Sequence, residues 1–448
     1  MRSFRPGELS QWVSRLWKNG MPAQRITGIC HDTRKIRPGE LYVAIRGAHF
    51  DGHEFVQAAK EKGAAGALVD DCFPGLDHFP LLQVSNTIKG LQDMAAGYRK
   101  EWVSSTVGIT GSVGKTTVKE MCADVLSMDG PTHRTAGNFN NHIGLPLTML
   151  DMPQQARYGV FEIGMNHPGE IGPLTDLLRP KYGIITTIGN AHREAFQSLQ
   201  EIANEKMKLA ERILDSGLLF LDRDSRWFPM IRQHTTAEVV TVSFEGEADY
   251  TGRYAGERLM TVDDYTYTIP KPGEYMMRNA LFAIALGLQL KLSPEEINAG
   301  LSRFKAPPMR WEKLIVHGIH FVNDAYNANP LSMRASLETF ARIPGVGRRW
   351  AVIGGMRELG AVSEEEHAEL GRFIDGLGLD GVITVGTLGA QIQCTRVPFF
   401  FHTQEKAEAA AVLKEQLSAG AHVLLKASRG EELEKVIGFF AELSGPEG

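Results

Sequence analysis

A glycine-rich segment, Gly108 to Thr116, ends in the pair Lys115-Thr116. It follows an apolar run, 103–109, that predicts a strand, and it precedes apolar residues at helical spacing over 118–126. A strand-to-helix turn points backbone N–H groups at one place, where the helix N-terminus adds partial positive charge. The lysine of such a loop reaches terminal phosphates, and the threonine hydroxyl ligates Mg²⁺. The segment therefore predicts a nucleoside triphosphate site. Its spacing, G-x-x-G-x-x-G-K-T, is shifted from the general phosphate loop, and an ordinary tight turn is the alternative.

Two more polar residues stand where predicted strands end. Glu162 belongs to the run 159–163, and His192 follows the run 183–188. Ligands of a mainly parallel sheet bind at the carboxyl ends of its strands. We therefore expect Glu162 to ligate Mg²⁺ beside the phosphate loop, with a solvated strand-end acid as the alternative. His192 lies at the same edge, although a lone histidine is more commonly structural or exposed.

The last third of the chain carries two polar clusters. Residues 323–330 follow an apolar strand, 319–322, and combine amides, an acid and an aromatic ring ahead of a helix that Ser332 caps. They predict a second face of the nucleotide and substrate site, with a turn rich in Asn and Pro as the alternative. Residues 426–430 follow the strand 423–425 and contain Lys426 and Arg429, which can hold an anionic group unless they form a solvated loop.

Bulk composition limits the classes of protein that fit. The chain has 448 residues, 43% hydrophobic and 23% charged, with a net charge of −5 and a pI near 6.3, so nothing suggests a nucleic-acid footprint. No apolar run approaches membrane-spanning length, and the N-terminus lacks the order of a secretion signal. Four scattered cysteines show no zinc spacing and indicate a reduced, cytoplasmic compartment.

The chain divides into three α/β units by its pattern of elements. We expect domains at 1–100, 101–308 and 309–448, because strands alternate with helices in each and Pro307-Pro308 marks a boundary. Residues 244–270 are polar and alternating, which predicts hairpins. Predicted strands, beyond those above, are 41–45, 63–69, 217–221, 350–353, 381–385 and 422–425, and predicted helices are 54–62 and 199–214.

Several of these segments occur together in one protein family. The phosphate loop, the segment Gly137–Pro146 and the strand-end segments Glu162–Asn166 and Asn190–His192 resemble those of the ATP-dependent Mur ligases of peptidoglycan assembly. The resemblance covers nearly the whole chain. Its most specific marker, Tyr326–Pro330, is similar to that of the members that add D-alanyl-D-alanine.

The resemblance implies a fold and an activity. The fold would be α/β in three domains: a small N-terminal domain that binds the UDP-sugar, a central phosphate-loop ATPase domain with a mainly parallel sheet, and a C-terminal Rossmann-like domain that closes the site. The activity would be ATP-dependent ligation of D-alanyl-D-alanine to UDP-N-acetylmuramoyl-tripeptide through an acyl phosphate, giving ADP and phosphate. ATP and Mg²⁺ would be required. The partners would be small molecules only, with no nucleic acid and no membrane insertion, and the protein would be a monomer.

The resemblance also implies roles for particular residues. Lys206 matches the lysine that the family carbamylates, whereas on its predicted helix alone it is typical of a surface lysine. The metal ligands would be Thr116, Glu162, His192 and Lys206, and the catalytic groups Lys115, Lys206, His192 and Glu162. The nucleotide would be bound by Gly111, Ser112, Gly114, Lys115, Thr116, Thr117, Asn279, Arg310, Asp324, Tyr326, Asn327 and Asn329. The substrates would be bound by Asp32, Thr33, Arg34, Asp51, Gly52, His53, Asn138, Asn141, Lys426, Ser428 and Arg429.

Three segments of the sequence depart from the family pattern. Tyr275-Met276 stand where His-Asn is usual, Gly355 stands where an acid is usual, and Lys208 replaces a glutamate two residues after the carbamylated lysine. Residues i and i+2 of a helix do not share a face, so Lys208 need not touch the metal. A Mur-type ligase with another acceptor or donor therefore stays open, as does a non-catalytic nucleotide switch, although no Asn-Lys-x-Asp guanine signature is present.

Overall fold

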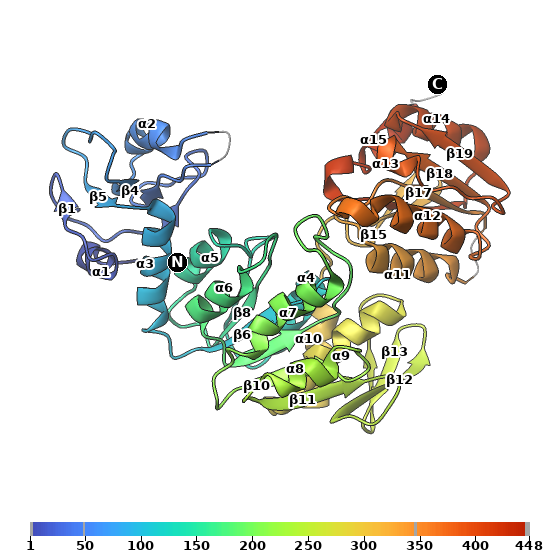
Figure 1. The fold of residues 1–448 in the computed structure, drawn as a ribbon, viewed down its shortest axis with the longest axis horizontal. Coiled ribbons are helices and arrows are strands. Elements are labelled where there is room, and N and C mark those ends of the chain that lie inside the picture. Colours follow the sequence, from blue (N-terminus) through green and yellow to red (C-terminus); the bar gives the residue numbers. More distant parts are fainter. Residues whose placement is uncertain (1–2, 48–49, 345–346, 444–448) are drawn as a thin grey trace.

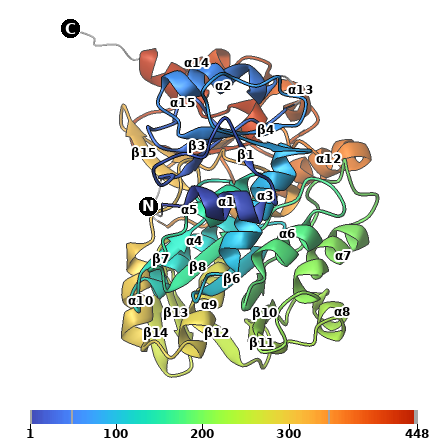
Figure 2. The same ribbon diagram turned by 90° about the vertical axis from the view of Figure 1, so that its left-hand side faces the viewer.

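The computed structural model describes residues 3–47, 50–344 and 347–443. Within these residues the chain builds three sheets in three lobes (Figure 1). We use N-terminal lobe for α1–α3, central lobe for β6–α10 and C-terminal lobe for β15–α15. Two perpendicular views place both outer lobes on the same side of the central lobe (Figure 2). The α/β class with mainly parallel sheets is confirmed, while the exact domain limits stay predictions.

The N-terminal lobe has a five-stranded sheet in the order β1-β5-β4-β3-β2. Only β1 runs antiparallel to its neighbour, and the other pairs are parallel. The predicted helix 54–62 is divided into a 3₁₀ turn, η1, and α2. The elements are α1 (Pro6–Trp12), β1 (Trp17–Lys18), β2 (Ile29–Cys30), β3 (Leu41–Val43), η1 (Gly52–Phe55), α2 (Val56–Glu61), β4 (Gly66–Asp70), β5 (Leu81–Val84) and α3 (Thr87–Arg99).

The central lobe has a nine-stranded sheet in the order β14-β13-β12-β11-β10-β9-β6-β8-β7. Strands β6 to β12 are all parallel to their neighbours within this set. Strands β12–β14 form the antiparallel hairpins that the polar alternation predicted. The elements are β6 (Ser105–Thr110), α4 (Lys115–Leu126), β7 (Thr132–Arg134), α5 (Gly144–Asp151), β8 (Tyr158–Glu162), α6 (Ile171–Leu178), β9 (Tyr182–Ile185), α7 (Leu199–Ala210), β10 (Leu218–Asp222), α8 (Phe228–Gln233), β11 (Glu238–Ser243), β12 (Tyr250–Gly256), β13 (Leu259–Val262), β14 (Tyr265–Thr268), α9 (Glu274–Gln289) and α10 (Pro294–Arg303).

Strand β6 is the point where the chain order of this sheet reverses. The chain continues from β6 to β7 and β8 on one side, then returns to β9 and β10 on the other. Crevices at such switch points, outside the carboxyl ends of the strands, are where open α/β sheets bind ligands. The phosphate loop after β6, Glu162 at the end of β8 and the loop after β9 therefore meet at one edge.

The C-terminal lobe has a six-stranded sheet in the order β15-β16-β20-β17-β18-β19. Only β15 is antiparallel to its neighbour. Because β16 and β20 are adjacent, the polar clusters that follow them lie side by side. The elements are β15 (Glu312–Val316), β16 (Ile319–Asn323), α11 (Pro330–Ala341), β17 (Arg349–Ile353), η2 (Gly360–Val362), α12 (Ser363–Ile374), β18 (Gly381–Val385), α13 (Gly386–Gly389), β19 (Phe399–Thr403), α14 (Lys406–Gln416), β20 (His422–Lys426), η3 (Arg429–Glu431) and α15 (Lys435–Glu442).

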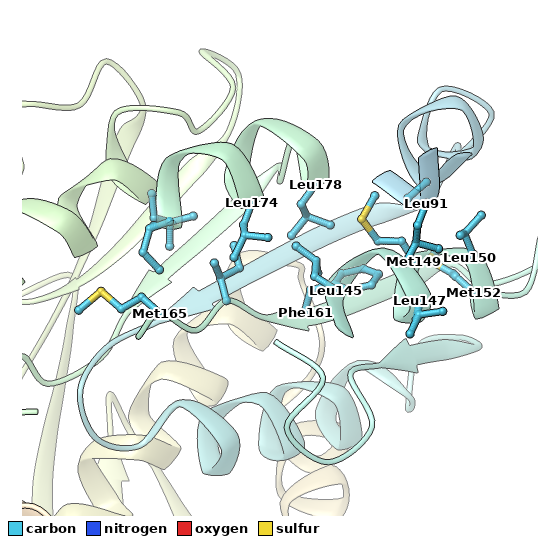
Figure 3. Packing of buried hydrophobic residues seen from close by; sticks show 14 of the residues in the cluster. Leu91, Leu145, Leu147, Met149, Leu150, Met152, Phe161, Met165, Leu174 and Leu178 are labelled. Atoms are coloured by element: carbon cyan, nitrogen blue, oxygen red, sulfur yellow. The ribbon is translucent and has the colours of Figure 1, made fainter. Parts of the chain in front are cut away.

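One continuous apolar core joins the N-terminal and central lobes. Leu91 of α3 belongs to the same buried cluster as Leu145 of α5, Phe161 of β8 and Leu178 of α6 (Figure 3). The ring of Trp102 stacks on Phe161 with centroids 5.7 Å apart. The C-terminal lobe keeps its own two clusters. Burial of apolar surface therefore fixes the first two lobes to each other, whereas the third is attached by the connecting segment 304–311 and by contacts at the site.

Candidate active site

The phosphate loop takes a conformation that its glycines allow. Gly114, with φ of 91°, precedes α4, and Gly111 has φ of 151°. A Cβ on Gly111 would lie 1.8 Å from Thr186 Oγ1, and one on Gly114 would lie 2.3 Å from Asn279 Oδ1. Only glycine fits both the backbone angle and the space at these positions. The loop is therefore built for close backbone approach at the N-terminus of a twelve-residue helix.

Two lysines meet at one carbonyl of this loop. Lys115 Nζ donates to the Gly111 carbonyl oxygen at 2.7 Å, and Lys206 Nζ donates to the same oxygen at 2.9 Å. Lys206 is 1% exposed. Burial lowers the pKa of Lys115. Burial, followed by the charge of Lys115, lowers the pKa of Lys206 far below its usual value, against the opposing carboxylates of Glu205 and Glu162. Sequence alone favoured a surface position for Lys206, and that expectation is wrong.

A hydroxyl and a carboxylate form the oxygen-rich side of the loop. Thr116 Oγ1 donates to Glu162 Oε2 at 2.8 Å, and Asn140 Nδ2 donates to Glu162 Oε1 at 2.8 Å. Glu162 is 3% exposed. Hard oxygen donors of this kind suit Mg²⁺, which keeps several waters and takes one or two protein ligands beside phosphates. The pair Thr116–Glu162 therefore fits a magnesium site, while the described residues contain no cluster of three or more His, Cys, Asp or Glu side chains placed to hold a metal ion.

Arg310, from the connecting segment, crosses to the phosphate loop. Its Nη2 donates to Thr116 Oγ1 at 3.2 Å, and its guanidinium lies over the ring of Tyr326, 4.1 Å from the centroid. Its Nε is buried and has no hydrogen-bond partner among the described residues. A buried donor without a partner is costly, so this atom indicates an acceptor that a ligand would supply.

Asp324 and Lys426 form a buried ion pair across β16 and β20. Their side chains approach to 2.7 Å, and Lys426 also donates to the carbonyl oxygens of Asp324 and Asn327. Asp324 additionally accepts from the backbone N–H of Trp311 at 3.0 Å and from the Ser336 hydroxyl at 2.8 Å. With its donors engaged in this way, Lys426 holds the 324–327 loop in place.

These residues surround one cavity of about 410 Å³ between the central and C-terminal lobes. Most of the predicted nucleotide and metal residues line it. Gly111, Lys206 and Ser428 are not among its lining residues, although Lys206 reaches the loop through the Gly111 carbonyl. The predicted residues that line it are Ser112, Gly114, Lys115, Thr116, Thr117, Asn138, Asn141, Glu162, His192, Asn279, Arg310, Asp324, Tyr326, Asn327, Asn329, Lys426 and Arg429.

Some lining residues have local structural roles. The Asn141 side chain accepts from the backbone N–H of Gly144 at 2.9 Å at the start of α5, and Asn329 caps α11 by accepting from Ser332 N–H at 2.9 Å. The Ser428 hydroxyl donates to the Ala328 carbonyl oxygen at 3.3 Å, outside the cavity. These contacts position loops.

The predicted substrate residues of the N-terminal lobe form separate clusters and do not line this cavity. Arg34 makes a two-point contact with Asp32, whose pKa this contact lowers. Asp51 accepts from the backbone N–H of His53 at 3.0 Å, and its carboxylate lies 2.6 Å from His53 Nδ1. Gly52 lies in the same turn, and the Thr33 carbonyl oxygen accepts from Lys62 at 2.8 Å.

Two residues that the sequence analysis did not name belong to the site. Asn140 contacts Glu162 and lies in the segment 137–146, in which the resemblance assigns roles only to Asn138 and Asn141. Glu358 approaches His192 Nδ1 to 2.6 Å from the C-terminal lobe. Its segment departs from the family pattern at Gly355, and nothing local in the sequence indicates that Glu358 reaches another lobe.

Of the residues that depart from the family pattern, only Tyr275 and Met276 line the cavity. Burial raises the pKa of Tyr275. Lys208 lies away from Lys206 and pairs with Glu211 at 2.9 Å, in agreement with the expected helix geometry. A Cβ on Gly355 would lie 2.3 Å from Leu388 Cβ, so the surrounding packing excludes an acid there.

Family models match most of the chain. The model of the Mur ligase family catalytic domain matches residues 25–96, that of the Mur ligase middle domain matches 109–287, and that of the Mur ligase glutamate ligase domain matches 309–429. None of the helices that the structure describes is long and apolar enough to cross a bilayer.

Individual proteins are similar over nearly the whole chain. A UDP-N-acetylmuramoyl-tripeptide–D-alanyl-D-alanine ligase of Bacillus subtilis is 36% identical and covers 92% of each chain, and one of Escherichia coli is 33% identical over 92% and 93%. A crystal structure of MurF from Acinetobacter baumannii matches with a TM-score of 0.90 at 28% identity over 99% of both chains. The structure of MurF ligase from Thermotoga maritima in complex with ADP has a TM-score of 0.82 at 25% identity, covering 93% and 97%.

Proposed function

This chain belongs to the Mur ligase family, and on that premise we propose that it joins D-alanyl-D-alanine to UDP-N-acetylmuramoyl-tripeptide by ATP-dependent amide formation. The observation that carries the proposal is the cavity in which the phosphate loop faces Arg310 and Tyr326, because it suits a triphosphate held between two lobes. The substrates come from the names of the relatives that match over 92% of the chain.

The nucleotide would lie along the phosphate loop and reach the C-terminal lobe. Lys115 and the loop N–H groups, with Gly111, Ser112, Gly114 and Thr117, would hold the phosphates. Arg310 would donate its unpartnered Nε to the nucleotide. Asn279, Asp324, Tyr326, Asn327 and Asn329 would shape the rest of the pocket.

Magnesium would be held by Thr116 and Glu162, with His192 and a carbamate on Lys206 at a second position. When bound, the metal would neutralise charge that develops on the transferred phosphoryl group. A carbamate forms when a neutral amine attacks CO₂, which creates an N–C bond and releases a proton. The low pKa of Lys206 supports this assignment, because it favours the neutral amine that the reaction needs.

The substrate residues would divide between two places. Asp32, Thr33, Arg34, Asp51, Gly52 and His53 would bind the UDP end in the N-terminal lobe, whereas Asn138 and Asn141 would contact the substrate from the wall of the cavity that they line. Lys426, Ser428 and Arg429 would shape the acceptor side, Lys426 through the 324–327 loop that it holds.

The reaction would follow from these positions. The tripeptide carboxylate attacks the γ-phosphorus, the bond to ADP breaks, and an acyl phosphate forms while Lys115 stabilises the developing charge. The amine of D-alanyl-D-alanine then attacks the acyl carbon, loses a proton and expels phosphate. The C-terminal lobe would exclude water, which would otherwise hydrolyse the intermediate.

A second candidate is a Mur-type ligase with a different acceptor or donor. Tyr275 and Met276 favour it, because they line the cavity where the family usually has His-Asn. We propose a cytoplasmic monomer in either case.

Phosphate release by the purified protein tests the proposal. With ATP, Mg²⁺ and UDP-N-acetylmuramoyl-tripeptide, release is expected to depend on D-alanyl-D-alanine. Single amino acids offered as acceptor, and UDP-muramoyl dipeptide offered as donor, separate the two ligase candidates. If the protein binds ATP but releases no phosphate with any of these donors and acceptors, both ligase candidates are contradicted.

A further inference from the structure

The loop after β9 makes polar contacts with the C-terminal lobe at three points. His192 Nδ1 lies 2.6 Å from Glu358 Oε2. Asn190 Nδ2 donates to Glu366 Oε1 at 2.7 Å. The backbone N–H of Glu194 donates to the Glu358 carbonyl oxygen at 3.0 Å. A side chain and the backbone of Glu358 therefore both bind this loop.

Both partners of the shortest contact have unusual backbone angles. His192 has φ of 57° and Glu358 has φ of 65°. The left-handed region is unfavourable for side chains of this kind and persists where the surroundings over-determine it. The contact between these two side chains therefore joins two residues with left-handed backbone, one from each lobe.

Close packing supports the same contact. A Cβ on Gly189 would lie 2.0 Å from Leu331 Cδ1, so the loop backbone lies against α11. The apolar clusters of the C-terminal lobe do not extend into the central lobe. Helix α9 also packs against α11, and among the contacts between the two lobes His192–Glu358 lines the nucleotide cavity.

We propose that Glu358 is a positioning residue that latches the C-terminal lobe to the central lobe and orients the His192 ring. An Nδ1–H that donates to Glu358 leaves Nε2 as the ring atom with a lone pair. Among the described residues, Nε2 has no hydrogen-bond partner. Only when the C-terminal lobe is docked does the His192 ring take a single orientation toward the cavity. The latch between the lobes does not depend on the ligase activity. The effect of the His192 orientation on Mg²⁺ binding rests on the proposed function, in which His192 is a metal ligand.

Lobe docking is measured first, on the full-length protein without substrates. Single-molecule energy transfer between dyes at the exposed positions Arg232 on α8 and Arg372 on α12 reports the ratio of docked to undocked molecules. Glu358→Ala is expected to lower this ratio about tenfold. Glu358→Gly, which accepts the left-handed backbone without strain, is expected to lower it similarly if the carboxylate is the latch. The matched control is Glu365→Gln, an exposed glutamate on α12, which should leave the ratio unchanged.

Magnesium dependence is measured second, by titrating Mg²⁺ against binding of a non-hydrolysable ATP analogue. Glu358→Ala is expected to need about tenfold more Mg²⁺ for half-maximal binding, with partial recovery in Glu358→Gln, whose amide oxygen still accepts from Nδ1–H. Unchanged docking in Glu358→Ala, or normal docking in Glu358→Gly, would overturn the latch. Altered docking with an unchanged Mg²⁺ requirement would overturn the orienting role of Glu358. Neither result depends on turnover, so failure of the ligase proposal is seen separately.

Discussion

Replacing Lys206 separates a buried structural lysine from a carbamylated one. Its Nζ and that of Lys115 contact the same Gly111 oxygen at 2.9 and 2.7 Å, so the two nitrogens lie within about 6 Å of each other. Two unit positive charges at that separation repel by about 3 kcal/mol at an effective dielectric of about 20. A carbamate on Lys206 would reverse the sign of this interaction.

The magnitude gives the expected rates. Loss of about 3 kcal/mol of stabilisation corresponds to roughly a hundredfold in rate, since 1.36 kcal/mol is tenfold. Lys206→Ala removes the anion and is expected to lower kcat/KM about a hundredfold or more. Lys206→Glu restores one negative charge and is expected to stay within about tenfold of the native rate.

Phosphate release in buffers with and without bicarbonate is the assay. Lys208→Ala is the matched control, because Lys208 pairs with Glu211 and should be replaceable without loss. Thermal unfolding of each variant checks that the fold is kept. Equal losses in the Ala and Glu variants, or full activity of Lys206→Arg without CO₂, would refute the reasoning.

Three further substitutions have defined outcomes. Glu162→Gln keeps a hydrogen-bond acceptor for Thr116 but removes the charge, so the Mg²⁺ concentration for half-maximal phosphate release should rise at least about tenfold; an unchanged requirement would contradict the metal assignment. Lys426→Ala leaves the buried Asp324 carboxylate without its cation and should lower the free energy of unfolding in urea by about 3 kcal/mol, and a change below about 1 kcal/mol would show that the pair is not a structural clamp. Arg34→Ala should raise KM for the UDP substrate while leaving KM for ATP unchanged, because Arg34 lies in the N-terminal lobe, away from the cavity; equal effects on both would exclude its proposed role.

The elements around the phosphate loop could be predicted because their signals are local. Strand β6, the glycine turn and α4 each follow from residues adjacent in sequence. Thr116, in the first turn of α4, meets Glu162 at the end of the neighbouring strand β8. Apolar composition predicts the ends of strands less reliably than their existence. Val103 was included in the first strand, but it is 96% exposed and the strand begins at Ser105.

Contacts between lobes could not be predicted from local patterns. Glu358 is an acid in a loop, far from His192 in sequence, and only the docking of two sheets brings them together. Lys206 was indistinguishable from a surface lysine, because helical spacing does not tell which polar side chain faces a phosphate loop. Its burial follows from how α7 packs beside β6 and β9.

The proposed reaction depends on one step, in which ATP activates a carboxylate by forming an acyl phosphate. The most direct measurement uses UDP-N-acetylmuramoyl-tripeptide labelled with ¹⁸O in its terminal carboxylate, with D-alanyl-D-alanine as acceptor. One labelled oxygen is expected in each released phosphate, because the carboxylate oxygen that attacks phosphorus leaves with it. Amide product formed with unlabelled phosphate would contradict the account.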